Sequence, residues 1–243
     1  DYWTTSLLGY YLGKQYQVKY KSKTSYYLIF KDSKFTYHKP GRVYQRRNEQ
    51  EILAWKTAHK DRVRQTLAET KTVVLTADEM HLSSQTTVQK VWLPRGNYPK
   101  IEVASKRQSR SIYGFLNIRT GQETAFKTSW QNMYVTAEVL GKLRAVYPHQ
   151  KILLIWDKAP WHKGSRAQEF IQQDGNIETI EFPAAAPEEN PQEHVWKTGR
   201  VQVTHNQFVT DIDQTTDQFI QYLNTATFDY DFLGIKSKAR VRA

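Results

Sequence analysis

The sequence predicts an α/β protein in which a mixed β-sheet carries helices on its faces and a small basic helical segment comes first. Three observations predict this class. Apolar residues have helical spacing over much of residues 1–70, β-branched and apolar runs begin after Lys71, and helices alternate with strands from residue 132 onward. Such alternation places helices against the faces of a sheet.

Two short helices are expected at the start of the chain. Residues 3–16 have apolar side chains at helical spacing with Thr4 or Thr5 as the N-cap, and residues 22–32 follow with Ser22 as the cap. Four side chains of the second helix are expected to face mostly inward: Tyr26, Leu28, Ile29 and Phe30. Two helices and a tight basic connection indicate a helix-turn-helix, although a generic helical hairpin fits the spacing nearly as well.

A basic linker follows over residues 33–48, with Pro40-Gly41 and five Lys or Arg. It either tracks phosphates and enters a minor groove, or is a plain solvated connector. The residues expected to contact DNA in the helices and the linker are Lys19, Lys21, Lys23, Thr24, Ser25, Lys39, Arg42, Arg46 and Arg47.

The remaining elements follow from periodicity and turn signals. Residues 49–69 predict an amphipathic helix. Strands are expected over 72–84, 90–96 and 99–105, a hairpin over 111–126 around Thr120-Gly121, and further strands over 151–157 and 177–183. Helices are expected over 132–147, 163–174, from Asn190-Pro191 onward, and over 211–224.

The net charge of +11 favours a polyanionic partner, most commonly nucleic acid. Residues 1–70 carry 14 Lys and Arg against 6 Asp and Glu, while residues 71–243 carry 21 against 18. The first part is therefore expected to contact DNA, unless its charge only forms a solvated face. There are no cysteines, so any metal must bind oxygen or imidazole. No apolar run is long enough to span a bilayer and no signal peptide is recognised, so a cytoplasmic location is expected.

Three carboxylates stand where the predicted elements begin or end. Asp78 and Asp157 close apolar strands, and Glu193 follows Asn190-Pro191. Three carboxylates from separate elements can hold two divalent ions, which is the arrangement that phosphodiester transfer requires. Each residue also has an ordinary explanation: an aspartate at a strand end is often a turn former, and Asn190-x-x-Glu193 matches a capping box. Glu79 follows Asp78, but successive strand residues point to opposite faces, so only one of them can join the site.

Two histidines lie beside these acids. His162 and His194 are expected to hydrogen-bond a ligand carboxylate or a DNA phosphate, or simply to pack. Trp161 and Trp196 are expected in the core or stacked on substrate.

Four stretches of the chain, between about residues 70 and 200, resemble the DDE transposases of the mariner superfamily, in particular its bacterial insertion-sequence branch. TADEMHL looks like the first-aspartate strand of that family, and VWLPRG is similar to its W-x-x-x-G strand. IWDKAPWH matches its D-x-A-x-x-H pattern, and APEENPQEHVWK matches P-E-x-N-P-x-E-x-x-W. Asp157 and Glu193 are separated by 35 residues, a spacing usual for the family.

The resemblance implies an RNase H-like fold with Asp78, Asp157 and Glu193 as the catalytic, metal-holding triad. It also implies two Mg²⁺ or Mn²⁺ ions per site, cleavage at terminal inverted repeats, transfer of the freed 3′-hydroxyl to target DNA, commonly at TA, and a homodimer that pairs two ends. The branch implies a bacterial protein associated with the nucleoid. Lys158 departs from the family, which usually has Asn there, and is expected to contact DNA phosphate or to weaken metal binding.

The organisation expected from the sequence has four parts: a partial helix-turn-helix over 1–38, a basic linker and helix over 39–70, the catalytic domain over 71–228, and a basic tail over 229–243. The leading interpretation is an active transposase. A catalytically silent DNA-binding protein of transposase descent is the alternative, because of Lys158. A nuclease for RNA–DNA hybrids is a third interpretation, which the basic N-terminal part disfavours.

Overall fold

The computed structural model describes residues 2–38, 44–96 and 99–235. It divides into two compact units, residues 1–44 and residues 45–243. Each unit is described by itself. None of the helices in these ranges is both long and apolar enough to cross a membrane.

The smaller unit contains helices α1 (Thr5–Tyr16) and α2 (Lys23–Asp32), as expected. Side-chain oxygens cap both: Thr4 Oγ1 accepts from the Leu7 N–H at 3.1 Å, and Ser22 Oγ accepts from the Thr24 N–H at 3.1 Å. Tyr26 is buried and lies against Gly9 of α1. Leu28 is 53% exposed, so the expectation that it faces inward is wrong.

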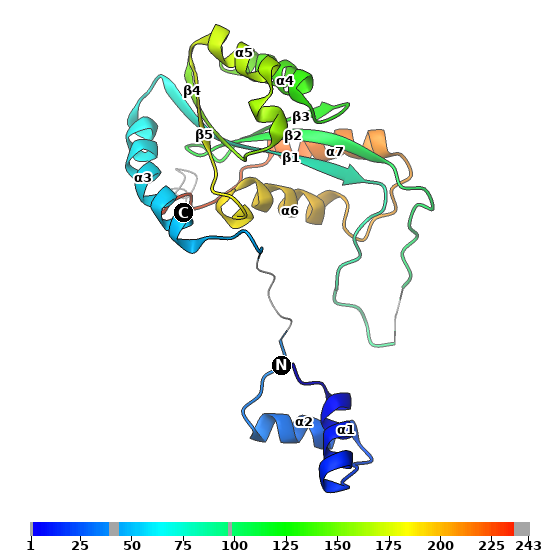
Figure 1. The fold of residues 1–243 in the computed structure, drawn as a ribbon. Coiled ribbons are helices and arrows are strands. Elements are labelled where there is room, and N and C mark those ends of the chain that lie inside the picture. Colours follow the sequence, from blue (N-terminus) through cyan, green and yellow to red (C-terminus); the bar gives the residue numbers. More distant parts are fainter. Residues whose placement is uncertain (1, 39–43, 97–98, 236–243) are drawn as a thin grey trace, which may run out of the picture. The chain divides into compact units, whose positions relative to one another are not determined.

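The larger unit is built on a five-stranded mixed sheet in the order β3-β2-β1-β4-β5 (Figure 1). β1 pairs antiparallel with β2 and parallel with β4, β2 pairs antiparallel with β3, and β4 pairs parallel with β5. The strands are β1 (Thr72–Ser83), β2 (Ser109–Asn117), β3 (Glu123–Thr128), β4 (Lys151–Trp156) and β5 (Ile177–Glu181).

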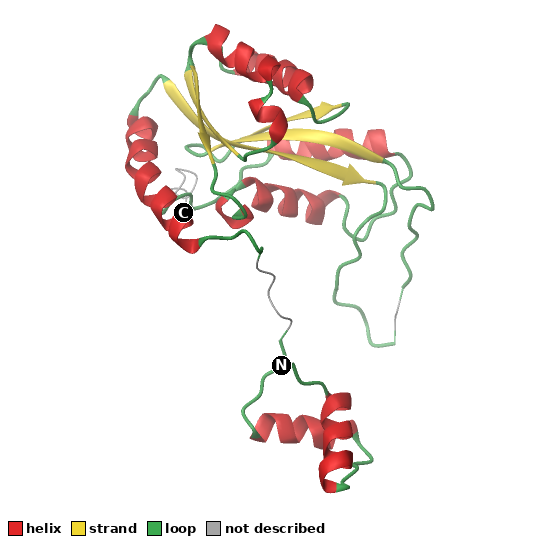
Figure 2. Ribbon diagram, in the orientation of Figure 1, coloured by secondary structure: helices red, strands yellow, loops and turns green. Residues whose placement is uncertain are grey.

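Helices cover both faces of this sheet (Figure 2). One face packs against α4 (Met133–Val146) and α5 (Ser165–Asp174), and the other against α6 (Gln192–Val203) and α7 (Ile212–Thr225). Two short 3₁₀ turns, η1 (Pro160–Lys163) and η2 (Pro187–Glu189), precede α5 and α6.

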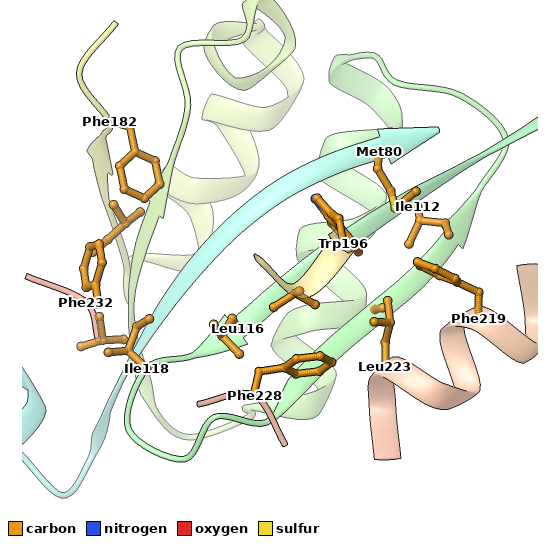
Figure 3. Close-up of a cluster of buried hydrophobic side chains, with 14 of the residues drawn as sticks. Met80, Ile112, Leu116, Ile118, Phe182, Trp196, Phe219, Leu223, Phe228 and Phe232 are labelled. Carbon is orange, nitrogen blue, oxygen red and sulfur yellow. The ribbon is translucent and has the colours of Figure 1, made fainter. Parts of the chain in front are cut away.

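Alternation along β1 separates the two hydrophobic cores. Val73, Leu75 and Ala77 face α4 and α5, whereas Val74 and Met80 face α6 and α7. Figure 3 shows the second core, in which Trp196 of α6 lies among sheet residues. By the same alternation Asp78 belongs to the α6 side of the sheet and Glu79 to the α4 side.

Helix α3 (Glu49–Ala68) belongs to the larger unit, although the sequence grouped it with the linker over 39–70. Its Val63 is fully buried, and Trp55 Nε1 donates to the Glu181 carbonyl at 2.7 Å. Phe232, assigned to a separate tail over 229–243, is also buried in this core. Apolar packing therefore extends the larger unit in both directions.

The strands expected over 90–96 and 99–105 are wrong, because the described residues between β1 and β2 are irregular. The end of β1 pairs directly with the start of β2, Ser83 opposite Ser109, so the chain between them leaves the sheet. Val91 and Trp92 are 58% and 103% exposed. Their apolar character predicted strands, but they have no ladder partner in the described part of the chain. The W-x-x-x-G stretch is therefore an exposed loop.

Candidate active site

The parallel register of β1 and β4 brings two of the predicted acids to the same edge of the sheet. The last paired residues are Thr76 and Ile155. Two residues farther along each chain, the same register aligns Asp78 with Asp157. β4 has ended there, but β1 continues to Ser83, so Asp78 lies inside β1 and the expectation that it closes its strand is wrong. Side chains at such a position are open to a ligand.

Both carboxylate oxygens of Asp78 accept hydrogen bonds. Oδ1 accepts from the Glu79 N–H at 2.8 Å, and Oδ2 accepts from Trp196 Nε1 at 3.3 Å. Burial raises the pKa of Asp78, and the negative charges of Glu79, Asp157 and Glu193 contribute to a value of about 7. The hydrogen bonds to Asp78 therefore do not offset burial and the repulsion from neighbouring acids.

Asp157 is held from the other side by His162. The carbonyl oxygen of Asp157 lies 3.0 Å from His162 Nδ1, and Asp157 Oδ1 lies 3.1 Å from the same nitrogen. Asp157 Oδ1 also accepts a hydrogen bond from the Ala159 N–H at 2.9 Å. Burial alone would raise the pKa of Asp157, but these hydrogen bonds outweigh burial and lower it. Asp157 is therefore the ionised partner of the pair at neutral pH.

His162 is a buried cation that bridges two acids. Its Nε2 lies 2.7 Å from Glu79 Oε1, and its ring stacks on Trp156 with centroids 4.1 Å apart. Burial would lower the pKa of His162, but the hydrogen bonds to Asp157 and Glu79 raise it to about 10. Among the described residues, Glu79, Asp157 and His162 each place one potential metal-ligand atom within 4.8 Å of the others. Both imidazole nitrogens are engaged, so the ring serves as a donor to Asp157 rather than as a ligand.

Glu193 lies in the first turn of α6 and is exposed. Asn190 fixes this helix start: its Nδ2 donates to the Ala77 carbonyl at 3.4 Å, and its Oδ1 accepts from the Gln192 N–H at 3.1 Å. The expected capping box does not form in full, because the Asn190 N–H donates to the Pro187 carbonyl. The Glu193 carboxylate is therefore not committed to capping its own helix.

Asp157 and Glu193 lie near enough to Asp78 for their negative charges to contribute to the rise in its pKa. Glu188 and Glu189, which precede the helix, instead form ion pairs with Arg47 and Lys56.

The two flanking residues lie differently from His162. Lys158 is exposed directly after Asp157. His194 is exposed on α6, and its ring lies against Tyr230 with centroids 5.8 Å apart, so its interaction is with that ring rather than with the three acids.

The residues predicted to contact DNA have mixed outcomes. Lys19, Lys21, Lys23, Thr24 and Arg46 are exposed, and Ser25 is partly so. Arg47 is bound by Glu49 and Glu188, so its guanidinium is already neutralised. Lys39 and Arg42 lie outside the described residues.

Three contacts around the acids were not predicted. Trp196 donates to Asp78, Asn190 ties α6 to β1, and Glu79 holds His162. The contact between Glu79 and His162 could have been anticipated from strand alternation, which places Glu79 on the face opposite to Asp78. In the sequence analysis this alternation served only to exclude Glu79 from the site of Asp78. The contacts to Trp196 and Asn190 depend on how α6 packs, and periodicity does not encode that.

The acids suit a hard divalent cation. They offer carboxylate oxygens, the ligands that Mg²⁺ and Mn²⁺ prefer, and burial together with repulsion from neighbouring acids raises the pKa of Asp78, which a bound cation would counteract. The donor set therefore fits the metal that the sequence resemblance implied.

The strand order, the two parallel and two antiparallel pairings, and helices on both faces define an RNase H-like fold. Residues 73–216 match the family described as DDE superfamily endonuclease. The chain belongs to this family. Residues 1–59 match the winged helix-turn-helix family.

Solved structures of similar fold include two complexes of Mos1 transposase. One is the paired-end complex with left transposon end, at a TM-score of 0.62 and 11% identity, covering 92% of this chain and 72% of the other. Another is the Mos1 mariner paired end complex with Mn, at a TM-score of 0.61 and 12% identity, covering 93% and 68%. No curated protein sequence matches the chain.

Proposed function

We propose that this endonuclease is a cut-and-paste DNA transposase. Asp78, Asp157 and Glu193 form its catalytic triad. Water attacks a phosphodiester at the transposon end and releases a 3′-hydroxyl, which then attacks a target phosphodiester and releases a new 3′-hydroxyl. The observation that supports the proposal is the parallel register that aligns Asp78 of β1 with Asp157 after β4, together with the contribution of the Glu193 charge to the raised pKa of Asp78.

The three acids would hold two divalent ions, Mg²⁺ or Mn²⁺. When bound, such ions stabilise the developing negative charge on the phosphoryl group and activate the attacking oxygen. The protein's own residues position the acids: Trp196 orients Asp78, His162 orients Asp157, and Asn190 secures the helix that carries Glu193. Such supporting contacts tune metal sites strongly.

Double-stranded DNA is the partner, as terminal inverted repeats and as target. The helix-turn-helix match, the exposed lysines of the smaller unit and the net charge support DNA binding. The family resemblance supports insertion at TA. The same resemblance, together with the paired-end complex of Mos1 transposase, which shares the fold, supports a homodimer that pairs two ends. Membership of the bacterial insertion-sequence branch, and with it a nucleoid-associated location, stays a prediction.

Asp157→Asn tests the triad. The variant should bind end DNA with wild-type affinity but lose nicking in Mg²⁺ by at least about 10³-fold, because one metal-holding oxygen is removed. Nicking is measured on labelled end DNA and binding by mobility shift. Asp61→Asn on the exposed face of α3 is the matched control and should nick normally. Normal nicking by Asp157→Asn would rule out the triad.

Lys158 separates an active transposase from a silent DNA-binding protein. If the wild type shifts end DNA without nicking it, Lys158→Asn introduces the residue usual in the family. If Lys158→Asn nicks end DNA, Lys158 is the cause of the missing activity in the wild type. Cleavage of RNA–DNA hybrids in preference to duplex ends would instead contradict the transposase proposal.

A further inference from the structure

Two buried polar side chains join β3 to the start of α6 beside the site. Gln192 Nε2 donates to Glu123 Oε1 at 2.9 Å. Glu123 is 4% exposed and Gln192 is fully buried. Gln192 immediately precedes Glu193, so this hydrogen bond acts on the first turn of the helix that carries the third acid.

Gly114 of β2 provides the space for this pair. A Cβ at Gly114 would lie 2.3 Å from Glu123 Oε1, 2.3 Å from Trp196 Cη2 and 2.7 Å from Gln192 Nε2. Gly114 is directly opposite Asp78 in the β1–β2 ladder. The pair and Trp196 therefore fill one space next to Asp78.

Packing stability does not account for the pair. Glu123 Oε2 and Gln192 Oε1 are buried, and neither has a hydrogen-bond partner among the described residues. Burial raises the pKa of Glu123 to about 8, and the charge of Asp78 contributes, so the carboxyl is mostly neutral at pH 7. Buried polar groups with unmet hydrogen bonds destabilise a fold. An apolar side chain of the same size would be more stable here.

We propose that Glu123 and Gln192 are positioning residues, which tie the start of α6 to β3 across Gly114 and so hold Glu193 toward Asp78. This role rests on the proposed function, because it concerns how the metal-holding acids are placed. Neither residue touches substrate. The pair acts through the helix backbone and through Trp196, which shares the space and orients Asp78.

Glu123→Met separates positioning from packing. Methionine fills the space without a charged or hydroxyl group, so the metal-free melting temperature should equal or exceed that of the wild type. The concentration of Mn²⁺ that produces a half-maximal rise in melting temperature should increase about 10- to 100-fold, as for other residues that orient metal-holding side chains. Gln192→Met should do the same.

The reciprocal exchange Glu123→Gln with Gln192→Glu keeps one acid and one amide in the same space. It should return Mn²⁺ affinity to within a few-fold of the wild type. Glu138→Met on the exposed face of α4 is the control and should leave Mn²⁺ affinity unchanged. Unchanged Mn²⁺ affinity in both methionine variants would overturn the positioning role.

The same titration distinguishes the two proposals. A Mn²⁺ effect that Asp157→Asn abolishes and Glu123→Met leaves intact contradicts the positioning role alone. A Mn²⁺ effect that Asp157→Asn leaves intact, or no effect in the wild type, contradicts the proposed triad and the positioning role with it.

Discussion

His162 shows how one residue couples the two faces of the sheet edge. It binds Glu79 on the α4 side and holds Asp157, while its ring is stacked on Trp156. A doubly donating imidazolium gives the buried Glu79 carboxylate an opposite charge, while Asp157 on the other side of the ring is about half exposed. The ring thus supports the fold and also orients an acid of the site.

His162→Gln should reveal this cation by its pH dependence. Folding raises the pKa of His162 from 6.5 to about 10, so the stabilisation is complete below about pH 6.5 and is removed as the pH rises through 10. We expect the variant to lose about 3 kcal/mol of unfolding free energy at pH 6 in metal-free buffer, and less near pH 10.

Urea unfolding across this pH range measures the effect. His149→Gln, at an exposed position before β4, is the control and should change stability by less than about 0.5 kcal/mol. A destabilisation by His162→Gln that does not shrink toward pH 10 would show that the ring is neutral in the folded protein.

At the scale of elements, α4 and α5 are joined by an ion pair at their C-terminal ends. Arg144 binds Asp174 with two hydrogen bonds of 2.6 Å, and its third nitrogen donates to the Tyr147 and Gln150 carbonyls at 2.7 Å. The paired side chains are 19% and 9% exposed. Arg144 therefore provides hydrogen bonds to carbonyl oxygens at the end of α4 and in the turn before β4.

Asp174→Asn should destabilise the larger unit by about 1.5–3 kcal/mol at pH 7, the range for hydrogen bonds to charged groups. Arg144 lowers the pKa of Asp174 below its ordinary value of 3.8. The stabilisation is therefore present above about pH 4 and disappears as the pH falls below it.

Thermal unfolding of Asp174→Asn and the wild type at pH 7 and at pH 3 tests this. Glu138→Gln breaks an exposed pair on α4 and should cost less than about 0.5 kcal/mol. An equal destabilisation by Asp174→Asn at both pH values would mean that the charge of Asp174 contributes nothing.

At the scale of the whole molecule, the three predicted acids all belong to the larger unit, whereas the smaller unit is rich in lysine. The smaller unit presents exposed lysines beside and within α2, while the sheet of the larger unit carries the acids. Arg47 belongs by sequence to the basic linker, but the larger unit neutralises it with two glutamates. We therefore expect DNA affinity to depend on the lysines of the smaller unit and not on Arg47.

Replacing Lys19, Lys21 and Lys23 by alanine should flatten the salt dependence of end-DNA binding. The slope of log K against log salt should fall by about 0.9 for each DNA phosphate that these lysines neutralise in the wild type. Arg47→Ala is the matched control and should leave the slope unchanged. A slope that the triple variant does not change would remove α2 from the DNA interface.

Local signals in the sequence were sufficient for most elements. Thr4, Ser22 and Asp211 cap helices as side-chain chemistry predicts, and the Thr120-Gly121 turn joins β2 to β3. The three acids were predicted because each follows an apolar run or a helix-start signal and their order matches a family. The two strands expected in the β1–β2 loop are wrong, because apolar residues alone do not create a ladder partner.

By itself the sequence determined the α/β class and the basic character of the first part, since periodicity, capping and charge are local properties; the three acids as a catalytic site stay a prediction. Only the tertiary structure decided what holds those acids. Glu79 and His162 are 83 residues apart, Trp196 and Asp78 are 118 apart, and Gln192 and Glu123 are 69 apart. Contacts of this kind follow from strand register and from the way a helix packs on a sheet. They depend on the shape of the whole core, which no short segment encodes.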